Sequence, residues 1–248
     1  GPFILETIAD NEIRLKRRPD LPPSSLKTLQ FKIIRDDNSR FLKMYKGDLD
    51  IVQSDMPLAK IKVFKKSPRF EVHENAGLSM TYLLLNLRDP LLKQLPVRQA
   101  IDLAIDRKEI IEHKLEGLAI PATSLLTPGN PFFEDKIPPT TYDIDKAKQL
   151  LEKVDKNHLF VLKTSNQASA VENGKVIAFQ LNKLGLQVQL KSFEWGTYYE
   201  DIKKGQFEMA TMRWVGTTDP DIYRLAFHSQ QLSPAGRNRG FYVNPSLD

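Results

Sequence analysis

Alternating apolar and polar residues predict that the chain begins with β-structure. Residues 12–17 alternate and residues 3–8 form a second β-like run, and Asp10-Asn11 between them favours a tight hairpin turn. Residues 28–35 alternate in the same way, which indicates a third strand. Shorter runs predict further strands at residues 48–52, 70–73, 80–87, 159–163, 186–191 and 207–214.

A helical spacing of apolar residues separates the later strands. Val97, Ala100, Ile101 and Ala104 recur at intervals of three and four residues and define one face of a helix. The order strand, helix, strand over residues 159–191 forms a βαβ unit, so the fold class is α/β or α+β. Spacing and capping residues also predict helices at residues 36–46, 57–65, 107–115, 143–154, 168–184 and 195–202.

The composition narrows the possible partners. The 248 residues carry 36 Lys and Arg against 31 Asp and Glu, and the basic residues are scattered, so we expect no nucleic-acid partner. Cysteine is absent, which excludes disulfides, thiolate metal sites and cysteine nucleophiles. No apolar run in the sequence reaches the roughly 18 residues that a membrane-spanning helix needs.

Motifs for catalysis, cofactors and metal ions are absent from the sequence. It contains no G-x-S-x-G, no phosphate-binding loop, no dinucleotide-binding glycine pattern and no H-E-x-x-H. The histidines lie far apart and form no short-range metal pair. Asp36 and Asp143 stand where helix N-caps are expected, a role that accounts for them better than catalysis. The sequence therefore predicts no enzyme, no cofactor and no metal ion.

One strand end is a candidate ligand site. The strand that ends at Trp214 delivers Arg213 and Trp214 into a loop with Thr217, Thr218 and Asp219. Open α/β sheets bind ligands where strands leave the sheet, and aromatic, hydroxyl and carboxylate groups together suit a ligand of mixed polarity. The alternative interpretation is a packed tryptophan followed by a turn that Asp219 stabilises.

Several short elements follow one another along nearly the whole chain in the order of a known family. They are Gly1-Pro2-Phe3, Gly47-Asp48-Leu49-Asp50-Ile51, Pro96-Val97-Arg98-Gln99-Ala100-Ile101 with Ala104-Ile105-Asp106-Arg107, Tyr142-Asp143 with Ala147, the set Trp195, Tyr198, Gly205, Phe207 and Trp214, and Asn244-Pro245-Ser246-Leu247-Asp248. Together they resemble the family 5 extracellular solute-binding proteins, which include the oligopeptide, dipeptide and nickel binders of ABC importers.

The resemblance implies an α/β fold like that of the type II periplasmic binding proteins, with two lobes. Residues 1–80 would be part of lobe I, residues 81–210 lobe II, and residues 211–248 would return into lobe I. The strands at 82–86 and 208–214 would be the crossings between the lobes. The N-terminal and C-terminal parts of lobe I would lie outside this chain, which is expected to be a fragment.

The same resemblance implies a function. The protein would be the extracytoplasmic substrate-binding component of an ABC importer, in the periplasm or at the cell surface, with its export signal outside this chain. It would capture a peptide or a similar small solute by lobe closure and deliver it to a membrane permease. Three alternatives stay open: a ligand-sensing domain of this fold within a transcriptional regulator, a binder of a sugar or metal complex, and a structural fragment that binds nothing because its cleft is incomplete.

The predicted site residues come from both crossings. Trp214 would form an apolar wall, while Thr217, Thr218 and Asp219 would form hydrogen bonds to the ligand. Arg213 either points away from the cleft or clamps a carboxylate. From the other crossing, the side chains of Tyr82 and Asn86 would face the cleft.

Thr217 departs from the pattern of the peptide-binding members. There, an aspartate commonly stands three residues after the tryptophan and pairs with the amino group of the peptide. This chain has Thr217 at that position, and Asp219 could replace the aspartate only in a different loop conformation. A non-peptide ligand therefore remains an alternative.

Overall fold

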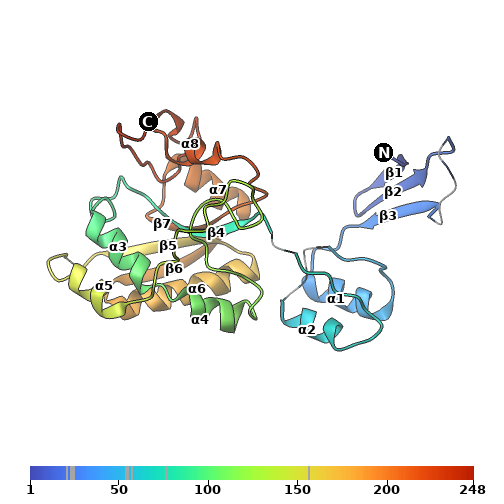
Figure 1. Ribbon diagram of the computed structural model, residues 1–248, viewed down its shortest axis with the longest axis horizontal. Helices are drawn as coiled ribbons and strands as arrows, with labels where there is room; N and C mark the ends of the chain where they lie inside the picture. Colours follow the sequence, from blue (N-terminus) through green and yellow to red (C-terminus); the bar gives the residue numbers. More distant parts are fainter. Residues whose placement is uncertain (21, 23–25, 54–55, 57, 76, 156) are drawn as a thin grey trace. The chain divides into compact units, whose positions relative to one another are not determined.

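The computed structural model describes every residue except 21, 23–25, 54–55, 57, 76 and 156 (Figure 1). The chain divides into two compact units, Gly1–His73 and Glu74–Asp248. No helix that the described residues form is long and apolar enough to cross a membrane.

The first unit begins with a three-stranded antiparallel sheet. β1 (Phe3–Ala9) pairs with β2 (Glu12–Arg17), and β2 pairs with β3 (Thr28–Lys32). The predicted hairpin is confirmed, because Ala9 lies opposite Glu12 across the turn.

Two helices, α1 (Asp37–Lys46) and α2 (Leu58–Lys65), complete the first unit around an aromatic core. The ring centroids of Phe41 and Phe64 are 5.1 Å apart, and Phe64 meets Phe70 edge-on at 4.7 Å. Such tilted and edge-on pairs are favourable aromatic geometries. This unit therefore has a core built from its own residues.

The ends of α1 follow the predicted capping chemistry. The Asp36 carboxylate accepts a hydrogen bond from the Ser39 amide at 2.7 Å, which confirms Asp36 as the N-cap. Gly47 adopts the left-handed conformation, with φ of 89°, and ends the helix. The same chemistry starts α5 (Ile144–Leu150), where Asp143 caps the helix.

Two of the predicted strands, at residues 48–52 and 70–73, are wrong. The described residues of both segments form turns or irregular chain outside the two sheets. Alternation of apolar and polar residues produces a strand only where a neighbouring strand accepts its hydrogen bonds. Phe70 instead packs into the aromatic core of the first unit.

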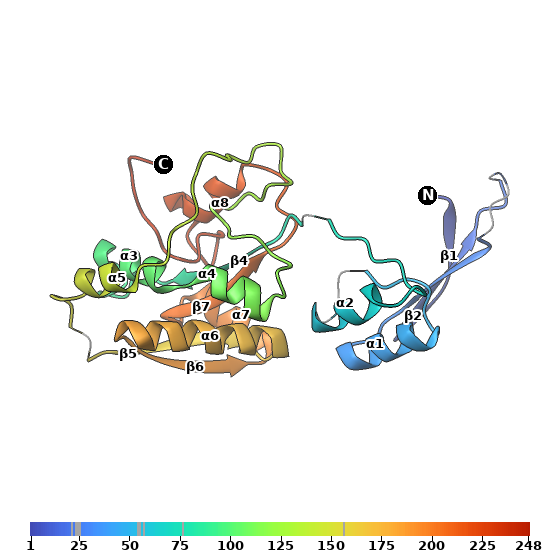
Figure 2. The same cartoon turned by 60° about the horizontal axis from the view of Figure 1, so that its bottom comes forward.

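The second unit is built on a four-stranded mixed sheet in the order β4-β7-β5-β6. β4 (Met80–Leu85) runs antiparallel to β7 (Met209–Trp214), while β5 (Leu159–Ser165) runs parallel to both β7 and β6 (Gln187–Phe193). The helix α6 (Ala168–Leu184) connects β5 to β6 and lies along the sheet in Figure 2, which confirms the predicted βαβ unit.

Helices cover both faces of this sheet. One face packs against α3 (Leu95–Ala104), α5 and α6, and the predicted apolar face of α3 is buried in that core. The other face packs against α7 (Trp195–Lys204), whose Tyr198 and Ile202 are buried against Ala210 and Met212. The fold class α/β is therefore confirmed.

Several helical segments differ from the sequence prediction. The helix predicted at 107–115 begins as α4 (Arg107–Glu109) and widens into the π-helical turn η1 (Ile110–Lys114). α5 is shorter than the predicted 143–154 because its last residues form turns. The sequence did not predict α8 (Ile222–Phe227) or the short 3₁₀ turn η2 (Ser229–Gln231).

Candidate functional site: a pocket beside the β4–β7 pair

The pairing of β4 and β7 brings two predicted site residues together. Met80 lies opposite Trp214, and Tyr82 lies opposite Met212. Because side chains alternate along a strand, Tyr82 and Trp214 project from the same face as diagonal neighbours. Their rings are inclined by only 12°, with centroids 6.3 Å apart.

An arginine from the C-terminal segment lies against this aromatic pair. The guanidinium group of Arg239 lies 5.1 Å from the ring centroid of Trp214 and 5.4 Å from that of Tyr199. Its Nη2 donates a hydrogen bond to the Tyr199 hydroxyl at 3.0 Å. These contacts orient the cation but do not neutralise it. Among the residues that the structure describes, no carboxylate forms an ion pair with Arg239.

A cavity of about 420 Å³ opens beside Tyr82 and Trp214. Its lining comes entirely from the second unit and is mostly apolar. Three arginines, Arg98, Arg237 and Arg239, also line it, and none of the described lining residues is Asp or Glu. A cavity of this size and charge suits a small solute with an apolar part and a negatively charged group.

Burial raises the pKa of two tyrosines on this side of the sheet, Tyr82 and Tyr198. It raises the pKa of Tyr82 above the ordinary value of 10.0, and the nearby charge of Arg239 opposes the shift. Burial also raises the pKa of Tyr198, whose hydroxyl donates to the Thr211 carbonyl. Both groups are therefore neutral near pH 7, and Tyr82 brings a neutral hydroxyl to the cavity wall beside Arg239.

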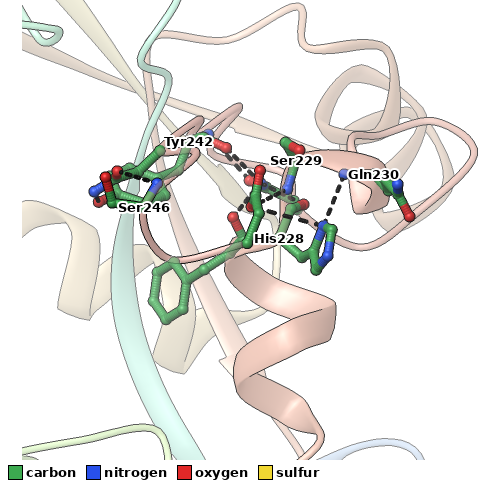
Figure 3. A network of polar contacts seen from close by, with 9 residues as sticks. His228, Ser229, Gln230, Tyr242 and Ser246 are labelled. Carbon is green, nitrogen blue, oxygen red and sulfur yellow. Dashed lines mark hydrogen bonds and ion pairs between the residues drawn. The ribbon is translucent and has the colours of Figure 1, made fainter.

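One buried amide fixes the wall that carries Arg239. Asn238 is 0% exposed, and its Nδ2 donates to the carbonyls of Phe227 and Tyr242 at 3.1 and 2.7 Å. Its Oδ1 accepts a hydrogen bond from the Tyr242 amide at 3.1 Å. Figure 3 shows Tyr242 and His228 within this network of polar contacts. Because Arg239 follows Asn238 directly, the network sets the position of the arginine.

Arg213 does not belong to this cavity. It lies opposite Thr81 in the strand register, so it projects from the face of the sheet that Trp214 does not occupy. Its side chain is exposed, and it is not among the cavity-lining residues. Arg213 therefore points away from this cavity.

The loop after β7 also lies outside the cavity lining. Thr217 is buried, and its carbonyl accepts a hydrogen bond from Asn130 Nδ2 at 3.2 Å. Thr218 and Asp219 are exposed. The Asp219 carboxylate accepts a hydrogen bond from the Asp221 amide at 2.8 Å, which is the turn geometry of the alternative interpretation.

The side chain of Asn86 forms hydrogen bonds that hold parts of the second unit together. It is buried just after β4, and its Nδ2 donates to the carbonyls of Gly205 and Phe207 at 3.1 and 2.7 Å. Its Oδ1 accepts a hydrogen bond from the Arg88 amide at 3.1 Å. The side chain therefore ties the end of β4 to the segment before β7, away from the cavity lining.

The structure adds residues that sequence reasoning missed. Arg237 and Arg239 lie in an irregular segment, where no periodicity indicates which way a side chain points. Tyr199 lies on α7, and its position on that helix gives no sign of its contact with Arg239. Only the folded chain brings these residues to the aromatic pair.

Comparison with known proteins identifies the fold and then the family. The family model described as bacterial extracellular solute-binding proteins, family 5 Middle, matches residues 1–233. The dipeptide-binding protein of Escherichia coli K12 is 28% identical over 249 residues, which cover 96% of this chain and 46% of that protein. The heme-binding protein A of Haemophilus influenzae is 28% identical over 207 residues, 80% of this chain and 38% of that protein.

A solved structure agrees with these matches. The ABC transporter-associated periplasmic binding protein DppA of Helicobacter pylori, in complex with the peptide STSA, superposes with a TM-score of 0.84 at 26% identity. The match covers 100% of this chain and 49% of that one. The α/β architecture is thus that of the periplasmic binding proteins. The chain belongs to the family 5 bacterial extracellular solute-binding proteins. It spans about half the length of the curated relatives it matches.

Proposed function

We propose that this chain provides the ligand pocket of the extracytoplasmic substrate-binding component of an ABC importer. The component works in the periplasm or at the cell surface, captures a peptide or similar small solute, and releases it to a membrane permease. β4 and β7 serve as crossings between two lobes that close over the ligand. Membership of the family and the peptide bound to the H. pylori relative support the proposal.

The observation that carries the proposal is the cavity beside Tyr82 and Trp214. Its volume of about 420 Å³ lies within the roughly 300–1,000 Å³ typical of small-molecule sites. Two stacked aromatic rings supply a flat apolar wall, and Arg239 adds a fixed positive charge beside it. This combination orients a solute without any catalytic group.

The charges of the cavity favour anchoring through a negative group of the ligand. Arg98 already donates to two backbone carbonyls, whereas the contacts of the Arg239 side chain within the described residues are with aromatic rings and the Tyr199 hydroxyl. A ligand carboxylate beside Arg239 would form charge-assisted hydrogen bonds and compensate a partly desolvated cation. Thr217 and Asp219 lie outside the cavity lining, so the C-terminal carboxylate of a peptide is a better anchor than its amino group.

The first test identifies the bound ligand. The protein is purified without unfolding, and native mass spectrometry detects any ligand, which is then released and sequenced or fragmented. A mixture of short peptides supports peptide capture. A single non-peptide solute overturns the peptide assignment, and the absence of any ligand together with no binding of added peptides contradicts the proposal.

A matched pair of variants tests the pocket itself. Trp214→Ala removes the aromatic wall and should weaken ligand binding by about tenfold or more, equivalent to roughly 1.4 kcal/mol. Phe179→Ala removes an aromatic ring that is 61% exposed on α6 and should leave the affinity unchanged. Calorimetric titration with the released ligand measures both. Equal affinities for wild type and Trp214→Ala would place the site elsewhere.

A second pair tests the anchor. The probes are the dipeptide Ala-Phe and its C-terminal amide, which differ in one negative charge. The acid should bind about tenfold more tightly than the amide, and Arg239→Gln should abolish this preference. Arg213→Gln, on the other face of the sheet, should preserve it. Equal binding of acid and amide to the wild type would refute the carboxylate anchor but leave solute capture intact.

A further inference from the structure

Three polar side chains that are distant in sequence lie close together beside the ends of three neighbouring strands in the second unit. Asp89 lies shortly after the end of β4, His158 directly precedes β5, and Glu208 directly precedes β7. The strand order β4-β7-β5, with β4 antiparallel to β7 and β7 parallel to β5, brings these ends together. One ligand atom from each side chain lies within 4.8 Å of the other two.

Hydrogen bonds from main-chain amides orient the two carboxylates of this cluster. Asp89 Oδ1 accepts hydrogen bonds from the amides of Leu91 and Leu92, both at 2.9 Å. Glu208 Oε2 accepts a hydrogen bond from the Val161 amide at 2.7 Å. One oxygen of each carboxylate is thus held by the main chain, while the second oxygen of Glu208, Oε1, contacts the imidazole of His158.

The imidazole of His158 is oriented as well. Its ring packs edge-on against Phe160, at 4.5 Å and 68° between centroids and planes, and Phe160 belongs to the buried core. Its Nε2 lies 2.5 Å from Glu208 Oε1. A nitrogen lone pair and carboxylate oxygens therefore converge on one point, from positions that rigid strand ends hold.

The cluster lacks a permanent cation. Within the described parts of the chain, no Lys or Arg forms an ion pair with Asp89 or Glu208, and the ion-pairing partner of Glu208 is the imidazole. Two carboxylates held close together repel each other, and a cation between them removes the repulsion. A metal ion at this point would replace the contact between His158 Nε2 and Glu208 Oε1 and offset the repulsion of the carboxylates.

We propose that Asp89, His158 and Glu208 bind a divalent transition-metal ion of the zinc class. One imidazole nitrogen with two carboxylate oxygens suits this class, whereas Mg²⁺ and Ca²⁺ prefer oxygen ligands alone. Three protein ligands leave a coordination position for water. The three ligands lie near the Leu85–Met209 end of the β4–β7 pair, and none of them lines the solute cavity. The metal therefore ties three strand ends together without lining that cavity.

Calorimetric titration of zinc into chelator-stripped protein tests the site. The wild type should bind one equivalent. Asp89→Asn, His158→Ala and Glu208→Gln should each weaken binding by roughly tenfold or more. The first and third substitutions keep an oxygen for the same backbone amides, so they remove charge without removing the hydrogen bonds of the fold. His113→Ala, an exposed histidine of η1, is the matched control and should bind as the wild type does.

Thermal unfolding supplies an independent readout. Zinc should raise the melting temperature of the wild type and of His113→Ala, because a ligand of the folded state stabilises it, and should not raise that of Asp89→Asn. The proposal is overturned if no stoichiometric zinc binds, if magnesium binds equally well, or if the three ligand variants retain the affinity of the wild type.

Discussion

At the scale of single residues, the cavity wall depends on the side chain of Asn238. Its amide is 0% exposed and satisfies two backbone carbonyls and a backbone amide of the neighbouring segments. Replacement by alanine leaves these groups without partners, and each unsatisfied buried polar group is costly. The same substitution would release the segment that carries Arg239.

We predict that Asn238→Ala lowers the free energy of unfolding by about 2–4 kcal/mol. Urea denaturation followed by tryptophan fluorescence measures it, because both tryptophans, Trp195 and Trp214, lie in the same unit as Asn238. Asn166→Ala, an exposed position, should change the value by less than about 0.5 kcal/mol. Similar losses for the two variants would contradict the role of the buried amide.

Two glycines with similar backbone strain differ in the space around them, so comparing them distinguishes the cost of strain from the cost of crowding. Gly117 and Gly205 both have positive φ, of 74° and 69°. A Cβ atom at Gly117 would meet nothing within 4 Å, whereas at Gly205 it would overlap Arg88 Nη2 and lie 2.7 Å from the Phe241 ring. The Arg88 side chain cannot move away freely, because it lies 3.6 Å from the Phe241 ring centroid.

We predict that Gly117→Ala destabilises the second unit by about 1–2 kcal/mol through strain alone. Gly205→Ala should destabilise it further, because crowding adds to the same strain. Thermal unfolding of the two variants compares them directly. Equal shifts in melting temperature would show that Arg88 and Phe241 relax without loss.

At the scale of elements, a short ion network joins α6 to η1. Glu172 in α6 accepts hydrogen bonds from Lys175 of the same helix at 2.8 Å and from Lys114 of η1 at 2.9 Å. The hydrogen bonds from these lysines, Lys175 first, lower the pKa of Glu172 from 4.5 to about 2. Its carboxylate is solvent-exposed, so the stabilisation is small and sensitive to salt.

The sign of the pH dependence follows from the lowered pKa. A carboxyl group of this kind contributes stability above its unfolded pKa and loses it as the pH falls through the folded pKa. Glu172→Gln should therefore reduce stability near neutral pH and have little effect at about pH 2. Thermal melts across this range at low salt measure the difference. Glu152→Gln, also exposed, is the control, and a loss for Glu172→Gln that persists at about pH 2 would exclude the ion network as its cause.

The elements that the sequence predicted well are those with local causes. The apolar face of α3 and the caps Asp36 and Asp143 need only neighbouring residues to define them. Residues 48–52 and 70–73 carry a strand pattern as well, but a strand requires a partner that no local pattern reveals. The π-helical turn η1 likewise has no distinct spacing in the sequence.

At the scale of the whole molecule, the sites depend on which segments the fold brings together. Trp214 was proposed from its place at the end of a strand and Tyr82 from the family resemblance, and the pairing of β4 with β7 brings their rings together. Arg239 was missed because an irregular segment returns to β7 only in the folded chain. The proposed metal ligands Asp89, His158 and Glu208 could not be grouped from the sequence for the same reason, since strand order makes them neighbours.

Each of the two units has a core of its own, so a core substitution in one unit should leave the stability of the other unchanged. Phe64 is 6% exposed in the aromatic core of the first unit, and Phe64→Ala should destabilise that unit by about 3–5 kcal/mol. Since both tryptophans lie in the second unit, the fluorescence-detected melt should stay unchanged while far-ultraviolet circular dichroism loses amplitude. Phe160→Ala, in the core of the second unit, should instead lower the fluorescence-detected melting temperature by roughly 6–15 °C. If Phe64→Ala lowered that temperature equally, the units would unfold together and their cores would not be independent.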